Sequence, residues 1–187
     1  MLFSRRVWLM HLALGPSLLV HTQGHAGNSA TIMDFRDPVL VRQMRIVNDD
    51  VMGGRSSSRF LIDPAGVIFE GLVSLDNNGG FASVRCPVSF PQQASALQLT
   101  TRGDGKQYQL IIRTEASTGA PIYKSDFVSS KDWQTHQFKP KDFEAAFRGR
   151  PVDAKPLVFS DAIEFGLLIA DKQAGEFRLQ LRQLQPI

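Results

Sequence analysis

The sequence predicts an all-β protein folded as a β-sandwich of jelly-roll type. Three observations carry this prediction. From residue 32 onward, apolar and polar residues alternate with a period of two, as they do along half-buried strands. Turn residues interrupt the alternation about every ten positions. Helix signals are weak, and only residues 139–147 favour a turn or two of helix.

Residues 1–26 are typical of a secretory signal peptide. Arg5 and Arg6 form a basic start, an apolar run covers residues 7–20, and small residues surround Ala26, after which we expect cleavage. The run is too short for a membrane-spanning helix, which needs about 20 residues. Sec and twin-arginine export both remain open. We expect a periplasmic or secreted protein, or a mitochondrial one if the leader is a transit peptide.

Residues 31–187 are expected to form one domain. Residues 59–63 and 67–75 flank a Pro-Ala-Gly turn, and residues 96–102 and 107–114 flank Gly-Asp-Gly-Lys, which predicts a hairpin. Further strands are expected at residues 121–128, 133–138, 162–170 and 176–184. The resulting count of about nine or ten short strands is typical of a sandwich or jelly roll.

The charge balance and the cysteine count exclude some functions. The net charge is +3, and removal of Arg5 and Arg6 with the leader leaves 19 basic residues against 18 acidic ones. No basic stretch interleaves with aromatic residues, so nucleic acid is not an expected partner. Cys86 is the single cysteine and has no intrachain partner for a disulfide.

Two polar, glycine-rich loops are the candidate ligand or partner segments. Their residues are Asn48, Asp49, Asp50, Gly53 and Gly54 in the first loop, and Asp76, Asn77 and Asn78 in the second, with Arg85 in the strand that follows. Asn and Asp bond their own backbone and Gly supplies positive φ, which predicts rigid turns. A structural calcium ion in the first loop is an alternative, although the spacing differs from an EF-hand. Asparagine amides offered to sugar hydroxyls are another.

Enzyme chemistry is not indicated. His136 is the only histidine after the leader, no Gly-x-Ser-x-Gly segment occurs, and no pair of carboxylates stands out. Nothing in the sequence links His136 to Cys86 as a base and a nucleophile. We therefore predict no catalytic residues, no cofactor and no metal site.

Three long segments resemble one protein family. They are "VNDDVMGGRSSSRF", "FEGLVSLDNNGGFASVR" and "RGDGKQYQLIIRT", and they occur in this order. Together they resemble the complex I intermediate-associated protein 30 family. The resemblance implies a galactose-binding-like β-sandwich of jelly-roll type. It also implies a role like that of the mitochondrial members, which are assembly chaperones of the NADH:ubiquinone oxidoreductase. The family has no established catalytic residues.

Two functions follow as hypotheses. The first is a non-enzymatic assembly factor whose partner is a protein intermediate. The alternative is a periplasmic carbohydrate-binding module whose partner is a glycan. A carbohydrate module needs exposed aromatic rings, for which Trp133 and Tyr123 are the candidates. A protein-binding chaperone should instead expose an apolar patch.

Overall fold

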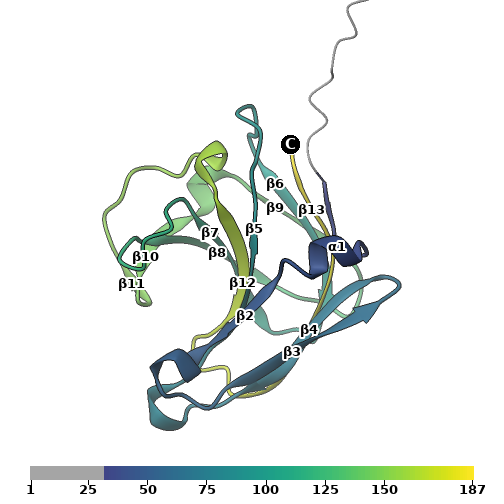
Figure 1. The fold of residues 1–187 in the computed structure, drawn as a ribbon, viewed down its shortest axis with the longest axis vertical. Coiled ribbons are helices and arrows are strands. Elements are labelled where there is room, and N and C mark those ends of the chain that lie inside the picture. The colour runs from purple at the N-terminus through teal and green to yellow at the C-terminus, as the bar shows by residue number, and fades with distance from the viewer. Residues whose placement is uncertain (1–31) are drawn as a thin grey trace, which may run out of the picture.

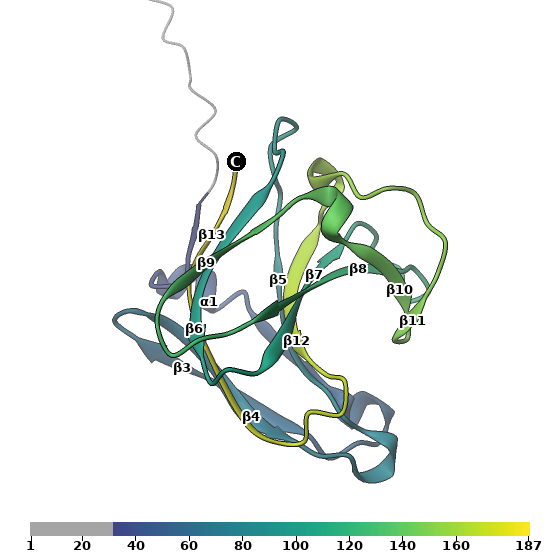
Figure 2. The ribbon, with the colours of Figure 1, turned by 180° about the vertical axis from the view of Figure 1, so that it is seen from behind.

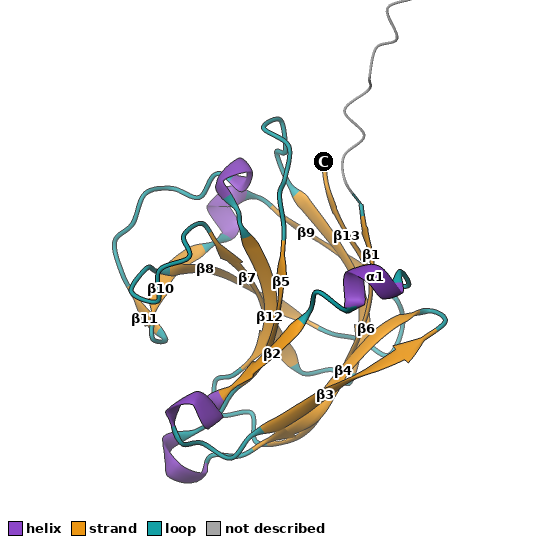
Figure 3. Cartoon of the chain, viewed as in Figure 1, coloured by secondary structure: helices purple, strands orange, loops and turns teal. Residues whose placement is uncertain are grey.

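A computed structural model describes residues 32–187, and these residues form two antiparallel sheets packed face to face (Figure 1, Figure 3). The first sheet has the order β3-β4-β13-β6-β9, with β1 also paired to β13. The second has the order β11-β10-β8-β7-β12-β5-β2. The predicted all-β sandwich is therefore confirmed. The predicted signal peptide lies outside the described residues.

The strands of the first sheet are β1 (Met33–Asp34), β3 (Ser57–Asp63), β4 (Gly66–Val73), β6 (Leu97–Gly103), β9 (Gln134–Phe138) and β13 (Gly175–Pro186). The strands of the second are β2 (Arg45–Asn48), β5 (Ala82–Pro87), β7 (Gln107–Arg113), β8 (Ile122–Val128), β10 (Glu144–Phe147), β11 (Arg150–Pro151) and β12 (Glu164–Ile169). Seen from behind, β9 and β8 run across the molecule in front of the other strands (Figure 2).

The core lies between the two sheets, and the period of two explains which side chains enter it. Tyr108, Leu110 and Ile112 of β7 point inward and are fully buried. Leu179 and Leu181 of β13 are equally buried on the opposite sheet. Burial of such side chains stabilises a fold by about 1.5–3 kcal/mol each. The alternation seen in the sequence is therefore the alternation between core and surface.

The prediction of a hairpin at Gly-Asp-Gly-Lys is wrong. β6 pairs with β13 and β9 of the first sheet, whereas β7 pairs with β8 and β12 of the second. Gly105 does adopt a positive φ of 86°. The turn crosses from one sheet to the other, because Asp104 bonds groups of later strands and both edges of β6 are already occupied. An Asp-Gly turn sets the local backbone but does not decide which strand pairs with which.

Other predictions need smaller corrections. The Pro-Ala-Gly turn does join a hairpin, in which Asp63 lies opposite Gly66. Residues 32–187 contain 13 strands rather than nine or ten. Of residues 139–147, only Pro140–Asp142 form a 3-10 turn, and Glu144–Phe147 form β10, which pairs with β8. A partner strand was available there, and it overrode a weak local preference.

One short α-helix was missed. Helix α1 (Pro38–Val41) begins at Asp37, whose carboxylate accepts a hydrogen bond from the Val39 backbone at 2.8 Å. An aspartate before a proline is a helix-start signal that was present in the sequence. Within residues 32–187, no helix has the length and apolar character needed to cross a membrane.

Candidate functional site

The two glycine-rich loops meet at one end of the sandwich. The first forms the 3-10 turn Asp49–Met52 after β2, and the second forms the 3-10 turn Asp76–Asn78 after β4. The two helical turns lie side by side at the lower left of Figure 3. The Asn77 side chain donates to the Gly53 carbonyl at 3.2 Å across the junction. We call this junction the paired-loop tip, meaning residues 49–54 and 75–80.

Asp49 joins the two loops. Its carboxylate is completely buried, and one oxygen accepts a hydrogen bond from the Ser56 backbone at 2.9 Å. The other oxygen accepts from the Ser56 hydroxyl at 2.5 Å and from the backbone N–H groups of Gly80 at 2.6 Å and Phe81 at 3.2 Å. Four donors therefore converge on one carboxylate, which satisfies a group that would otherwise be costly to bury.

The hydrogen bonds also keep Asp49 ionised. Burial by itself raises the pKa of a carboxyl. Here the bonds from the Ser56 hydroxyl and from the backbone of Gly80, Ser56 and Phe81 outweigh burial, so the pKa of Asp49 lies below its ordinary value. An ionised, fully bonded carboxylate holds the two loops in one arrangement.

The glycines of the tip are required by geometry. Gly53 has a φ of 88°, in the left-handed region that side-chain-bearing residues avoid. Gly54 lies against the Asp49 side chain, and a methyl group there would overlap the Asp49 carboxyl carbon. The Asn residues contribute too, because Asn77 and Asn78 have φ values of 55° and 59°. The sequence prediction of rigid Asx and glycine turns agrees with these angles.

The polar side chains of the tip divide between buried, bonded positions and exposed ones. Asn48 is buried, and its side-chain oxygen accepts from the Ser58 hydroxyl at 2.8 Å. Asp49 is fully occupied, unlike a calcium ligand, whose oxygens point at the ion. Asp50 and Asp76 are exposed. Within residues 32–187, no three His, Cys, Asp or Glu side chains group as metal ligands would.

The tip also presents apolar side chains outward, and the sequence analysis missed them. Val51 and Met52 are 67% and 64% exposed at the crest of the first loop. Leu75 of the second loop is 44% exposed, and Leu72 of the adjoining strand is 45% exposed. The signal was available, since Val-Met is an apolar pair inside an otherwise polar loop. Asp49 lies inside the tip, whereas Val51 and Met52 face the solvent together with Asp50 and Asp76.

Arg85 does not belong to the tip. It lies in β5 opposite Arg45 of β2, on the face of the second sheet that points away from the core. Asn48 pairs with Ala82 where β2 meets the tip, and Arg85 is three residues further along, roughly 10 Å away. Its neighbour is Glu164, whose Oε1 lies 3.9 Å from Arg85 Nη1.

Both aromatic side chains that were candidates for sugar stacking already make contacts within the protein. Tyr123 is 7% exposed, and its hydroxyl donates to the Lys155 carbonyl at 2.8 Å. Trp133 is half-buried, and the guanidinium groups of Arg102 and Arg182 lie 4.9 Å and 5.0 Å from its ring centre. A sugar ring would have to displace these cations to stack on Trp133.

Cys86 and His136 are not arranged for catalysis. They lie on β5 and β9, which belong to different sheets. Burial, together with the charge of Glu164, raises the pKa of the Cys86 thiol to about 11, so the thiolate is scarce at neutral pH. Burial lowers the pKa of His136, whose ring packs 4.7 Å from that of Phe127.

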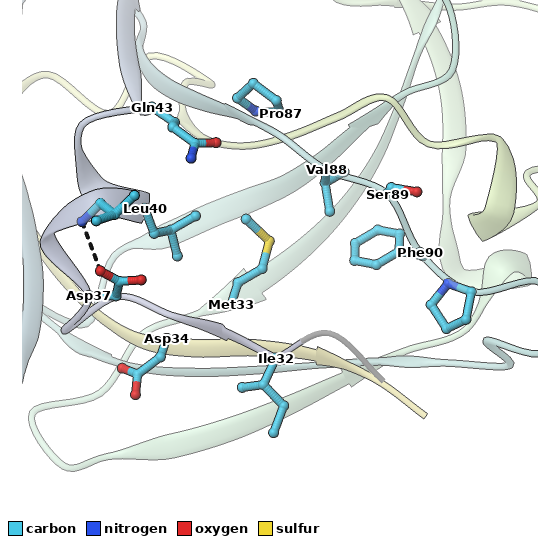
Figure 4. A pocket seen from close by; sticks show the side chains of 12 residues that line it. Ile32, Met33, Asp34, Asp37, Leu40, Gln43, Pro87, Val88, Ser89 and Phe90 are labelled. Atoms are coloured by element: carbon cyan, nitrogen blue, oxygen red, sulfur yellow. Dashed lines mark hydrogen bonds between the residues drawn. The ribbon is translucent and has the colours of Figure 1, made fainter. Parts of the chain in front are cut away.

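A hollow of about 540 Å³ opens between α1 and the segment after β5 (Figure 4). Met33, Leu40, Val88 and Phe90 point into it, and Asp37, the helix cap, lies at its margin. Met33 and Phe90 are core residues, 6% and 4% exposed. Asp34, Gln43 and Ser89 also line it, so the hollow is an indentation of mixed polarity beside α1.

Comparisons with known proteins agree with this architecture. The family model of complex I intermediate-associated protein 30 (CIA30) matches residues 33–181. A sequence comparison with curated proteins finds no match. Among solved structures, the chain is similar to a family 11 carbohydrate-binding module of the cellulase Lic26A-Cel5E of Clostridium thermocellum, with a TM-score of 0.60 and 12% identity over 83% of this chain and 93% of that one. It is also similar to the agarase AgWH50C, with a TM-score of 0.55 and 12% identity over 84% of this chain and 26% of that one. At such identities these structures show a shared β-sandwich fold.

Proposed function

Because the chain belongs to the complex I intermediate-associated protein 30 family, we propose that it is a non-enzymatic binding protein that acts as an assembly factor. Its partner is then an assembly intermediate of the NADH:ubiquinone oxidoreductase, the complex to which the family's name refers. The family match spans most of the described domain, which supports this proposal. The paired-loop tip is the surface through which we propose that it binds.

The observation that carries the proposal is the exposure of Val51 and Met52 on a rigid support. Apolar side chains gathered on a surface mark protein interaction sites. Methionine is well suited to such contacts because it is flexible and polarisable. Asp49 fixes the backbone beneath them through four hydrogen bonds, so little loop entropy is lost when a partner binds.

The test is capture of the partner with and without these side chains. We would tag the C-terminus, cross-link in the native host, and identify captured proteins by mass spectrometry. We expect NADH dehydrogenase subunits with the unmodified chain and at least a tenfold loss with Val51→Ser/Met52→Ser, equivalent to about 1.4 kcal/mol. Ile62→Ser is the matched control, because Ile62 is 72% exposed near the far end of β3 from the tip.

Absence of respiratory subunits from the unmodified capture would count against the assembly role. Equal capture by the double variant and by Ile62→Ser would leave the role standing but remove the tip as its surface. Circular dichroism and a thermal melt of each variant show whether the fold is intact.

The compartment decides which part of the respiratory complex is within reach. We propose that the leader directs the chain to the periplasm or outside the cell, and a periplasmic protein does not reach the peripheral arm of the complex. A mitochondrial location would follow from a transit peptide instead. Fractionation and N-terminal sequencing of the native protein distinguish the two locations, since export through a signal peptide predicts a mature chain that starts near Gly27.

Glycan binding is the second candidate function. The similarity in fold to carbohydrate-binding modules supports it, one of them described in complex with a β-1,3-1,4-mixed-linked tetrasaccharide at a TM-score of 0.55 and 13% identity over 82% of this chain and 93% of that one. The burial of Tyr123 and the two guanidinium groups around Trp133 argue against a stacking platform for a neutral sugar at these rings. We therefore place glycan binding after protein binding.

A further inference from the structure

We propose that the outward face of the second sheet holds a binding site for a hydroxylated carboxylate, built from Arg45, Arg85, Arg113 and Glu164. Arg45 lies opposite Arg85 across β2 and β5, and Glu164 lies opposite Arg113 across β12 and β7. The residues next to them along these strands, such as Cys86 and Phe165, point into the core. The four charged side chains therefore share one face. We call them the arginine–glutamate cluster.

The cluster has more positive than negative charge. Glu164 Oε2 accepts a hydrogen bond from Arg45. Its other oxygen lies 3.6 Å from Arg113 Nε and 3.9 Å from Arg85 Nη1. One carboxylate thus serves three guanidinium groups. Three guanidinium groups and one carboxylate leave an excess of two positive charges in the cluster. An anionic group on a ligand would reduce this excess.

Two buried atoms of the cluster lack hydrogen bonds. Arg85 Nε, a donor, and Glu164 Oε1, an acceptor, are both shielded from solvent without a hydrogen-bond partner. Leaving such groups unsatisfied costs about 1–3 kcal/mol each, and more for charged groups. A ligand that reaches both atoms, through a shift of the covering side chains, must accept a hydrogen bond from arginine and donate one to glutamate.

A hydroxylated carboxylate has this combination. Its carboxylate matches the planar, forked donors of a guanidinium, and its hydroxyl groups donate to Glu164. The phosphoryl group of a phosphate monoester dianion offers only acceptor oxygens, so that group would leave Glu164 Oε1 without a donor. A neutral sugar would leave the excess positive charge unmatched.

The cluster is largely shielded from solvent, except at Arg45. Ser83 and Ile111 are only 1% and 2% exposed although they lie on the outward face. The side chains of Glu164 and Arg113 are 12% and 14% exposed, whereas that of Arg45, on the edge strand β2, is 54% exposed. Electrostatic attraction is stronger where water is partly excluded. Arg45 marks the open side from which a ligand would enter.

Two sources supply this chemistry, a free sugar acid and a uronic-acid residue of a glycan chain. The site shares no residue with the paired-loop tip, so the test of ligand binding does not decide the assembly role. We would titrate the protein calorimetrically with D-glucuronate, an oligogalacturonide, a neutral cello-oligosaccharide and inorganic phosphate. We expect saturable binding of D-glucuronate or of the oligogalacturonide. Tighter binding of the oligogalacturonide identifies a glycan, and binding of D-glucuronate alone identifies a free acid.

The variants locate the site. We expect Arg113→Gln and Arg45→Gln each to weaken binding at least tenfold. Arg59→Gln is the control, because Arg59 makes an ion pair with Glu70 on the other sheet at 2.7 Å. Arg45 is half-exposed, so Arg45→Gln should fold even if Arg113→Gln does not, and a thermal melt checks both. Val51→Ser/Met52→Ser should bind the same ligand unchanged.

Three results would overturn the proposal. The first is no saturable binding of either acidic probe. The second is equal or tighter binding of phosphate or of the neutral oligosaccharide. The third is unaltered affinity in folded Arg45→Gln, which would place the ligand elsewhere.

Discussion

The most constrained single residue is Asp49. It was a candidate ligand in the sequence, and the structure makes it the acceptor for two loops separated by about 30 residues of chain, as its bonds to Ser56, Gly80 and Phe81 show. A residue of this kind stabilises the tip without touching a partner. Loss of its hydrogen bonds should therefore lower the free energy of unfolding rather than remove a direct contact with a partner.

Asp49 also predicts an acid dependence of stability. The pKa of Asp49 is lower in the folded protein than in the unfolded chain, where it is near 3.9. The unfolded chain therefore takes up a proton first as the pH falls. The stability that Asp49 contributes is complete above about pH 5 and is lost as the pH falls through the unfolded and then the folded pKa.

Ser56→Ala tests this dependence. Loss of the Ser56 hydroxyl removes one bond to Asp49, and we expect the free energy of unfolding at pH 7 to fall by about 1–2 kcal/mol. The difference from the unmodified protein should shrink below pH 4, because a protonated Asp49 gains less from that bond. Urea unfolding at a series of pH values measures this difference. Ser58→Ala is the control, because the Ser58 hydroxyl donates to the neutral side chain of Asn48. A difference that does not change with pH would contradict the role given to the ionised carboxylate.

At the scale of elements, the turn between β6 and β7 decides the topology. Asp104 accepts hydrogen bonds from the Tyr108 hydroxyl at 3.1 Å, the Ser129 hydroxyl at 3.2 Å and the Arg178 backbone at 2.9 Å. Tyr108 and Arg178 belong to strands of different sheets. The aspartate thus connects strands of the two sheets where the chain crosses between them.

Asp104→Ala should destabilise the protein by about 1–3 kcal/mol, because the Tyr108 hydroxyl loses its acceptor and Tyr108 is fully buried. Burial, with the adjacent Asp104 carboxylate, raises the pKa of Tyr108, so the hydroxyl stays protonated and needs that acceptor. Tyr108→Phe should cost less in the Asp104→Ala background than in the unmodified protein. A double-mutant cycle by urea unfolding measures the coupling, and additive effects would show that the bond contributes nothing.

At the scale of the whole molecule, the two sheets share one core. Phe35 near the start packs 5.8 Å from Phe165 of β12, and the last strand, β13, is central in the first sheet. The first and last segments of the described chain are thus integrated into the same core. Such a molecule should open cooperatively.

Cys86 provides a probe of this cooperativity. It is the single cysteine, is fully buried, and has a pKa raised to about 11. We expect iodoacetamide at pH 8 to label it only through global unfolding, so the labelling rate should rise with urea in parallel with the unfolded fraction. Mass spectrometry follows the label, with Cys86→Ala as the blank. Rapid labelling in the absence of urea would reveal local opening of β5.

Part of the site was predictable from the sequence because it depends on local chemistry. The glycine and asparagine turns follow from the conformational freedom of those residues, and the φ angles of Gly53 and Asn77 agree. The exposure of Val51 and Met52 was not predicted, because an apolar pair in a loop faces either the core or the solvent. The direction in which the pair faces depends on Asp49, which lies beneath it because backbone donors of the distant segment 80–81 bind its carboxylate.

The sequence by itself determined the fold class, the alternation between core and surface, and the family. These properties arise from periodicity and local motifs, which act over a few neighbouring residues. Only the tertiary structure decided that the Asp104 turn crosses between sheets, that Asp49 joins two loops, and that Arg45, Arg85 and Arg113 surround Glu164. Each of these depends on which strands lie side by side. Strand pairing is selected by the burial of whole sheet faces, a property of the entire chain that no short segment carries.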